Sequence, residues 1–127
     1  KRDTYGWVHQ LGYVETRDLP AIYRSANVTV FPSIYEGFGL PILESLASGT
    51  PVITSHTSSL PEVGGDAAIY IDPYNSRDIA DAMRGLMSSS SLQKQLRDRG
   101  IARARQFTWE KAARETLKVF QESVTSL

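Results

Sequence analysis

Two glutamates lie eight residues apart on either side of a Gly-Phe-Gly turn. Glu36 and Glu44 occur within the stretch SIYEGFGLPILES (33–45), which follows a hydrophobic run and leads into an amphipathic segment. Gly37 and Gly39 allow backbone angles that other residues avoid, and they let a ligand approach closely. The first turn of the following helix, Leu40 to Leu43, offers backbone N–H groups that attract phosphate oxygens. These residue types and their spacing predict a site for a ligand that carries both phosphate and hydroxyl groups.

The two acids are placed for different partners. A carboxylate about 4 Å from a phosphate repels it by roughly 4 kcal/mol at an effective dielectric constant near 20. A helix N-terminus returns only about 0.3–1 kcal/mol of attraction, or up to about 2 kcal/mol in a buried site. Glu36 lies before the turn and should therefore face hydroxyl groups. Cationic side chains must also help to hold a diphosphate, and none lies close to this turn in the sequence.

Glu44 lies one turn into the helix that is expected to start at Leu40. It falls at the rim of the apolar face, and helical side chains tilt toward the helix N-terminus, so its carboxylate points back toward the glycine turn. A group that only accepts hydrogen bonds suits the vicinal hydroxyls of a ribose. The simpler alternatives are a surface glutamate near a helix start and a glycine turn that binds no ligand.

The composition excludes several classes of protein. The 127 residues suffice for one domain, and equal numbers of basic and acidic residues, 14 each, give no reason to expect nucleic acid as a partner. The absence of cysteine rules out disulfides and thiolate metal sites. His9 and His56 are isolated, so no metal site is expected. No apolar run reaches about 18 residues and no signal peptide opens the sequence, although a signal could have been lost upstream. A cytoplasmic location is expected.

Four arginines gather near the end of the sequence, namely Arg97, Arg99, Arg103 and Arg105. The ordinary interpretation of such a cluster is a solvated helix face. The alternative is peripheral contact with anionic lipid, which would place the protein at the cytoplasmic face of a membrane.

Short apolar runs alternate with amphipathic segments along the first part of the chain. Strands are expected at residues 7–14, 27–31, 51–55 and 67–71, and helices at residues 17–26 and 40–49. Gly49 is a typical residue for the end of the second helix. Ser59 and Glu62 have the spacing of a capping box that opens a short helix. This alternation predicts an α/β fold with a Rossmann-like parallel sheet and helices on both faces.

After the fourth expected strand the pattern is helical to the end. The last helix is expected to begin at Thr108 as its N-cap. Its apolar face is expected to join the core through Trp109, Ala113, Leu117, Phe120 and Val124. Four strands are few for a doubly wound sheet, and the sequence lacks an initial Met, so we expect the start of the domain to be missing. Ligands bind such sheets beyond the carboxyl ends of the strands, where the stretch 33–45 lies.

Several ordered motifs extend over about residues 6 to 124, namely LGYV, DLPAIYRSANVTVFPSIYEGFGLPILESLASGTPVITS, SSLPEVGGDAAIYIDP and FTWEKAA. Together they resemble the C-terminal domain of retaining nucleotide-sugar glycosyltransferases of the group 1, or family 4, type. Such enzymes have two Rossmann-like domains, the GT-B architecture, and an E-x7-E signature. Glu36 and Glu44 match this signature without departure.

The resemblance implies a role for each part of the site. Glu36 would be the catalytic residue that holds hydroxyls of the transferred sugar, and Glu44 would bind the ribose. The donor sugar and diphosphate would be contacted by Gly37, Phe38, Gly39 and Leu40. The nucleobase pocket would be formed by Gly12, Tyr13, Val14 and Leu19. The segment Ser59 to Val63 would shape the same end of the sheet. No metal or other cofactor is implied, and the donor would be a GDP- or UDP-hexose, with mannose favoured by the motifs SHTSSLPEV and IDPYN.

Two parts of the family pattern are absent from these 127 residues. The basic Arg/Lys pair comes from the early part of the C-terminal domain, and a glycan or lipid-linked acceptor would bind through the N-terminal domain. We therefore expect residues 1–127 to be a single, partial nucleotide-sugar-binding domain from the C-terminal half of a GT-B fold. Because catalysis needs the missing charges, the chain alone is expected to transfer no sugar.

Other functions remain open from the sequence. A nucleotide-sugar epimerase or a glycogen-type phosphorylase has a similar fold, but the latter needs a lysine-bound pyridoxal cofactor, and Lys94, Lys111 and Lys118 all lie in late helices. A non-catalytic nucleotide-sugar-binding or assembly module would show the same motifs. A plain dinucleotide-binding domain is disfavoured, because the glycine turn lacks a third glycine and follows a later strand.

Overall fold

The sheet is parallel, and its three strands lie in the order of the sequence. The computed structural model describes residues 6–125. Its strands are β1 (Thr29–Phe31), β2 (Val52–Ser55) and β3 (Ala68–Ile71). The central strand is β2, whose Val52 pairs with Thr29 on one side and with Ala68 on the other. The predicted α/β class is confirmed, as are the last three of the four expected strands.

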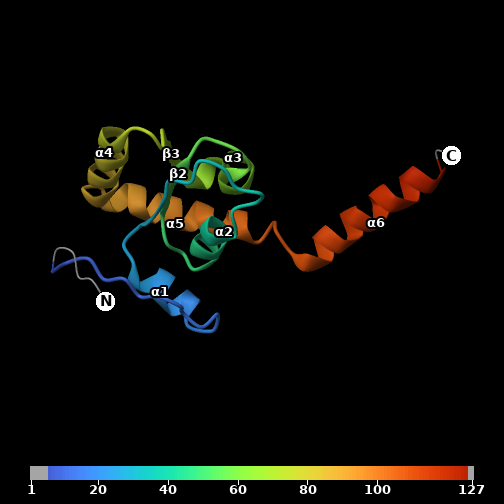
Figure 1. Ribbon diagram of the computed structural model, residues 1–127, viewed down its shortest axis with the longest axis horizontal. Helices are drawn as coiled ribbons and strands as arrows, with labels where there is room; N and C mark the ends of the chain where they lie inside the picture. Colours follow the sequence, from blue (N-terminus) through green and yellow to red (C-terminus); the bar gives the residue numbers. More distant parts are fainter. Residues whose placement is uncertain (1–5, 126–127) are drawn as a thin grey trace.

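Helices connect the strands and continue after the last of them (Figure 1). They are α1 (Leu19–Ser25), α2 (Leu40–Ala47), α3 (Leu60–Gly64), the 3₁₀ turn η1 (Gly65–Ala67), α4 (Ser76–Met87), α5 (Ser90–Ala104) and α6 (Trp109–Thr125). The end of α2 is a Schellman motif, in which Gly49 has φ 76° and the Thr50 N–H donates to the Ser45 carbonyl at 3.0 Å. Thr108 caps α6 as predicted, because its hydroxyl accepts from the Lys111 N–H at 3.1 Å.

The two faces of the sheet carry separate hydrophobic clusters, because successive strand residues point to opposite faces. Val52 packs with α2 and α3, in the cluster formed by Ile42, Leu46, Val52, Leu60, Val63 and Ala67. Ile53, the next residue, packs with α4 and α5, in the cluster formed by Ile53, Ile71, Leu86 and Leu96. Helices therefore cover both faces of the sheet, as the sequence predicts.

Helix α5 packs closely against α2 at a glycine. A Cβ atom on Gly100 would lie 3.0 Å from the Cδ2 atom of Leu46, which is fully buried. Helix α5 continues through Gly100 to Ala104. Gly100 therefore serves as the contact point between two helices.

The strand expected at residues 7–14 is absent from the structure. These residues form no regular element, and three of their large side chains are strongly exposed: Trp7 by 77%, Leu11 by 61% and Tyr13 by 85%. A strand needs a neighbour to pair with its N–H and C=O groups. Within residues 6–125 no sheet edge lies along this segment. A short run rich in apolar residues was therefore an insufficient basis for this prediction.

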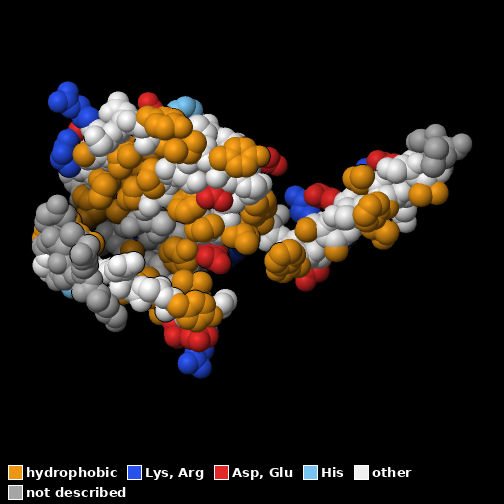
Figure 2. Space-filling view, in the orientation of Figure 1, with side chains coloured by type: hydrophobic (Ala, Val, Ile, Leu, Met, Phe, Trp, Pro, Cys, Tyr) orange, Lys and Arg blue, Asp and Glu red, His pale blue; other side chains and the backbone are white. Residues whose placement is uncertain are grey.

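The expected burial of the last helix is also wrong. Helix α6 extends away from the other elements as an arm (Figure 1), and its apolar residues lie on the surface (Figure 2). Trp109 is 83% exposed, Phe120 66% and Val124 74%. Periodicity correctly predicts an amphipathic helix. It does not say what covers the apolar face, and nothing among the described residues does.

The contact at Gly100 yields a stability prediction with an internal control. Replacing Gly100 by Val places two methyl groups against Leu46, and such overpacking should lower the free energy of unfolding by about 1–3 kcal/mol. Gly85, in α4, has no atom within 4 Å of its ideal Cβ position. Gly85→Val should therefore change stability by less than about 0.5 kcal/mol. Urea denaturation of both variants measures this difference, and equal effects would contradict the close packing of α5 on α2.

Candidate functional site

Two loops meet beyond the carboxyl ends of β1 and β2, and serine hydroxyls join them. The Glu36 N–H donates to Ser58 Oγ at 3.2 Å, and the Ser58 hydroxyl donates back to the Glu36 carbonyl. Ser59 Oγ also donates to the carbonyls of Glu36, at 3.0 Å, and of Phe38, at 2.9 Å. Ser58 has φ 58°, an unfavourable angle for a residue with a side chain. The peptide of Glu36 is thus fixed by the loop after β2.

The carboxylate of Glu36 is half-buried and has one free oxygen. Ser33 Oγ donates to Glu36 Oε1 at 2.9 Å, and the carbonyl of Ser33 accepts from Thr57 Oγ1 at 3.3 Å. The other oxygen, Oε2, has no partner among residues 6–125. Glu36 is therefore oriented by one hydroxyl and keeps an acceptor for another.

The two glycines of the turn differ in whether there is room for a side chain at their position. Gly39 is buried with φ 102°, and a Cβ atom there would lie 2.8 Å from the Cδ2 atom of Leu60. Packing alone therefore explains a glycine at position 39. At Gly37 a Cβ atom would meet nothing within 4 Å. Among the two, only Gly37 leaves open space beside the turn.

The start of α2 presents unpartnered backbone donors. No backbone N–H from Gly37 to Leu40 has a hydrogen-bond partner within the described part of the chain. The expectation that free N–H groups extend to Leu43 is wrong, because Ile42 and Leu43 donate to the Gly39 carbonyl at 3.2 and 3.3 Å. The donors lie one turn earlier than expected. They are the N–H groups predicted to contact a donor sugar and diphosphate.

Glu44 is half-buried and faces α1. The Tyr23 hydroxyl donates to Glu44 Oε2 at 3.1 Å, while the Tyr23 carbonyl accepts from Thr50 Oγ1 at 2.6 Å. Burial, and then the negative charge and hydrogen bond of Glu44, raise the pKa of Tyr23 to about 12. The hydroxyl is therefore protonated at neutral pH and remains a donor to Glu44. The second oxygen of Glu44 has no partner among the described residues.

The residues predicted to form the nucleobase pocket lie on and before α1. Gly12 has φ 71° and is exposed, Tyr13 is 85% exposed, and Val14 and Leu19 are half-buried. Leu19 opens α1, the helix that carries Tyr23. The structure thus links this segment to Glu44 through Tyr23, and its role as a base pocket stays a prediction.

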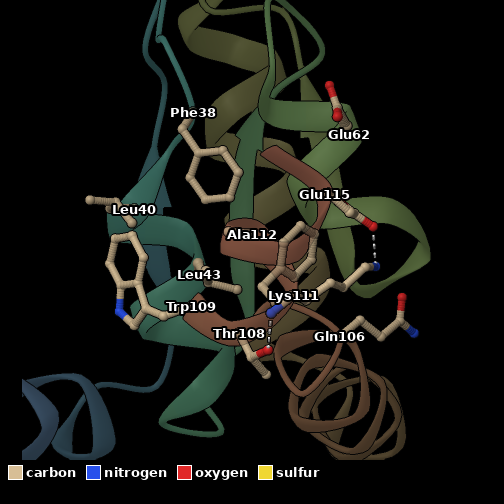
Figure 3. Close-up of a pocket in the computed structure, with 11 residues that line it drawn as sticks. Phe38, Leu40, Leu43, Glu62, Gln106, Thr108, Trp109, Lys111, Ala112 and Glu115 are labelled. Carbon is tan, nitrogen blue, oxygen red and sulfur yellow. Dashed lines mark hydrogen bonds and ion pairs between the residues drawn. The ribbon is translucent and has the colours of Figure 1, made fainter. Parts of the chain in front are cut away.

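A cavity of about 410 Å³ lies beside the glycine turn, between the start of α2 and the start of α6 (Figure 3). Its wall includes Phe38 and Leu40 from the turn, and the remaining lining residues are Leu43, Glu62, Gln106, Phe107, Thr108, Trp109, Lys111, Ala112 and Glu115. Lys111 brings a cation to this wall, but it forms an ion pair with Glu115 at 3.8 Å.

The arginine cluster has two members committed to contacts within the protein. Arg99 pairs with Asp66 at 3.8 Å. Arg103 is half-buried and donates to the carbonyls of Val63 and Glu62. Arg97 and Arg105 are exposed, so a lipid surface would meet mainly these two. None of the helices within residues 6–125 has the length and apolar character that a bilayer crossing requires.

No group of three or more His, Asp or Glu side chains in the described range could hold a metal ion.

Sequence reasoning missed the side chains that hold the site together. Ser59 was considered as a capping residue and as part of a segment that shapes this end of the sheet, and Ser58 was not singled out. The Ser59 hydroxyl makes no cap hydrogen bond in α3. Tyr23 lies in the helix expected at residues 17–26, and no partner was predicted for it. The need of its phenol oxygen for a hydrogen-bond partner could have been predicted, because a tyrosine on a partly buried face usually has one. The identity of that partner, 21 residues away, required the structure.

Comparison with known proteins places these features in a family. The model of the family Glycosyl transferases group 1 matches residues 4–107. The chain is 42% identical over 116 residues to O-antigen chain mannosyltransferase B of Escherichia coli, covering 91% of this chain and 30% of that protein. It is 34% identical over 121 residues to the MMP alpha-(1->4)-mannosyltransferase of Mycolicibacterium hassiacum, covering 92% of this chain and 29% of that protein. The chain therefore spans about 30% of the length of these relatives.

Solved structures agree on the fold. A sucrose-phosphate synthase from Thermosynechococcus elongatus superposes with a TM-score of 0.81 at 28% identity, over 92% of this chain and 30% of that one. The C-terminal domain of a glycosyl transferase group 1 family protein from Francisella tularensis superposes with a TM-score of 0.67 at 31% identity, over 76% of this chain and 51% of that one. The predicted resemblance to the C-terminal domain of a GT-B fold is confirmed. The chain belongs to the group 1 glycosyltransferase family.

Proposed function

We propose that this chain is the donor-binding part of a retaining glycosyltransferase that moves a hexose from a nucleoside diphosphate to an acceptor hydroxyl. The observation that carries the proposal is the arrangement around α2. Two half-buried carboxylates, Glu36 and Glu44, each with a free oxygen, flank a run of unpartnered backbone N–H groups at a helix N-terminus. A nucleotide sugar carries hydroxyls on two sugar rings, with a diphosphate between them.

Each part of the ligand has a matching group. The N–H groups of Phe38, Gly39 and Leu40 suit the oxygens of the sugar and diphosphate, supported by the helix dipole. The free oxygen of Glu44 suits the ribose hydroxyls. Glu36, before the turn, suits hydroxyls of the transferred sugar, because a carboxylate on the phosphate itself would repel it.

Mannose is the hexose that we favour. Two relatives with 42% and 34% identity are named as mannosyltransferases. The donor would then be a GDP- or UDP-linked mannose, and the acceptor a glycan or lipid-linked sugar bound by a domain outside this chain. We propose residues 1–127 as a single, partial nucleotide-sugar-binding domain, without a required metal, in a protein located in the cytoplasm or at the cytoplasmic face of the membrane.

The two acids should separate binding from turnover in the full-length enzyme that contains this domain. Glu44→Ala removes the ribose acceptor, and losing a charge-assisted hydrogen bond should weaken donor binding by about ten- to a hundredfold. Glu36→Ala should leave nucleotide binding mostly intact and lower kcat by on the order of a hundredfold or more. Glu110→Ala, an exposed glutamate in the first turn of α6, is the control. Calorimetric titration with nucleoside diphosphate measures the affinity, and steady-state kinetics measure kcat. Unchanged donor affinity in Glu44→Ala would refute the ribose role.

The Tyr23–Glu44 contact predicts how stability depends on pH. The pKa of Tyr23 rises from 10.0 to about 12 in the folded protein, so between these values the folded state binds a proton that the unfolded state releases. This stabilisation is complete below pH 10 and is lost as pH rises to about 12. Urea denaturation between pH 9 and 12 should therefore show a steeper loss for the wild type than for Tyr23→Phe. Tyr74→Phe, at a 76% exposed tyrosine, should behave as wild type; parallel curves for all three proteins would exclude the contact.

The isolated chain should bind the nucleotide sugar but should not transfer its hexose. Stabilising a leaving diphosphate requires cationic groups, and Lys111 and Arg103 are already engaged with Glu115 and with the carbonyls at the end of α3. Purified residues 1–127 should therefore show no release of nucleoside diphosphate above the buffer rate in a coupled assay with acceptor present. Sustained turnover by this polypeptide would show that the donor-binding part alone suffices.

A further inference from the structure

We propose that Phe107, held in place by Arg103, is a positioning residue for the donor loop, which we define as residues 36–40. Phe107 lies in the short connection between α5 and α6, far from the loop in sequence. What the loop binds rests on the function proposed above. The positioning itself concerns the conformation of the unliganded protein and can be tested separately.

The contact between Phe107 and the loop is an edge-to-face ring pair. The rings of Phe38 and Phe107 lie 5.8 Å apart between centroids, with an angle of 77° between their planes. Such pairs contribute more than their buried area alone. Phe38 is 40% exposed and adjoins the cavity beside the turn (Figure 3), so burial alone does not fix its ring. Phe107 is thus the aromatic partner that restrains Phe38.

Arg103 restrains Phe107 in turn. Its guanidinium carbon lies 5.0 Å from the centre of the Phe107 ring, within cation–π distance. The same guanidinium donates to the carbonyl of Val63 at 3.1 Å, to that of Glu62, and to Gln106 Oε1 at 2.8 Å. It is therefore anchored to the end of α3 and cannot rotate freely. This rigid cation forms one wall of the site that holds the Phe107 ring.

Helix α3 contacts the donor loop at its start and Arg103 at its end. At its start Ser59 donates to the backbone carbonyls of Glu36 and Phe38, and at its end the carbonyls of Glu62 and Val63 accept from Arg103. The donor loop is therefore held twice by the same helix. Ser59 holds its backbone directly, and the Phe107 ring holds the Phe38 side chain through Arg103.

Restraint matters here because of the composition of the loop. Gly37 and Gly39 give the backbone more freedom than other residues would, and that freedom must be lost when a ligand binds to the N–H groups. Fixing Phe38 before binding removes part of this entropic cost, which is the usual benefit of preorganisation. Phe107 should therefore favour binding of the sugar and diphosphate without touching either.

NMR relaxation of the unliganded 127-residue chain tests this directly. In Phe107→Ala the backbone order parameters of Gly37, Phe38 and Gly39 should fall from the rigid range near 0.85 toward about 0.6, while those of β2 stay unchanged. Trp109→Ala is the matched control, because it removes an 83% exposed ring from the start of α6, two residues away, with no ring contact to Phe38. Phe107→Tyr keeps the ring pair and should retain wild-type values. Phe107→Leu, which keeps most of the side-chain volume, gives the same test if the alanine variant fails to fold.

Ligand binding supplies a second readout. Affinity for a nucleoside diphosphate hexose should fall about two- to tenfold in Phe107→Ala, matching the usual strength of a ring pair, whereas affinity for the free nucleoside should not change. Phe38→Ala combined with Phe107→Ala should be no weaker than either single variant. Unchanged order parameters in Phe107→Ala, or an equal fall in Trp109→Ala, would overturn the proposal. Absence of nucleotide-sugar binding by the wild type would instead contradict the proposed function, and the order parameters would still decide the role of Phe107.

Discussion

The contact between Gly39 and Leu60 determines where α2 begins, and the site depends on that position. Gly39 has a left-handed backbone angle, φ 102°, that disfavours other residues, and a Cβ atom there would lie 2.8 Å from Leu60, so Leu60 would have to move to make room for it. Helix α2 starts at Leu40 with Gly39 as its N-cap, which leaves the N–H groups from Gly37 to Leu40 without partners within residues 6–125 and puts Glu44 a little over one turn into the helix. A shift of one residue in this start would rotate Glu44 away from Tyr23. The hydrophobic core thus sets the geometry of a polar site on the surface.

The site is rich in acceptors and backbone donors but poor in free cations. Glu36 and Glu44 are both oriented by neutral hydroxyl groups, from Ser33 and Tyr23, and neither forms an ion pair with another described residue. Each carboxylate therefore keeps an oxygen that can accept from sugar hydroxyls. Within residues 6–125 the charge of a bound diphosphate would also stay largely unbalanced, because a helix N-terminus contributes only about half an elementary charge. A complete donor site would need positive side chains from another part of the protein.

The sequence predicted those features that depend on neighbouring residues. The three strands, the Schellman motif at Gly49 and the cap at Thr108 follow from local residue preferences and were correct. Features that depend on distant partners were not predictable. The hydroxyls of Ser58 and Ser59 have several local uses, and only the fold brings them to Glu36. The apolar run at residues 7–14 and the apolar face of α6 likewise show that a segment could pack against a partner, but not whether that partner is present.

The central claim is that a nucleotide sugar lies across the start of α2. It is tested most directly by titrating the isotopically labelled 127-residue chain with GDP-mannose and UDP-hexoses while recording amide NMR spectra. The account predicts saturable shifts for the amides of Gly37, Phe38, Gly39 and Leu40 with at least one of these donors, accompanied by shifts around Glu44 and Tyr23. Saturable shifts confined to another surface, or no saturable shift at the four loop amides with any donor, would contradict it.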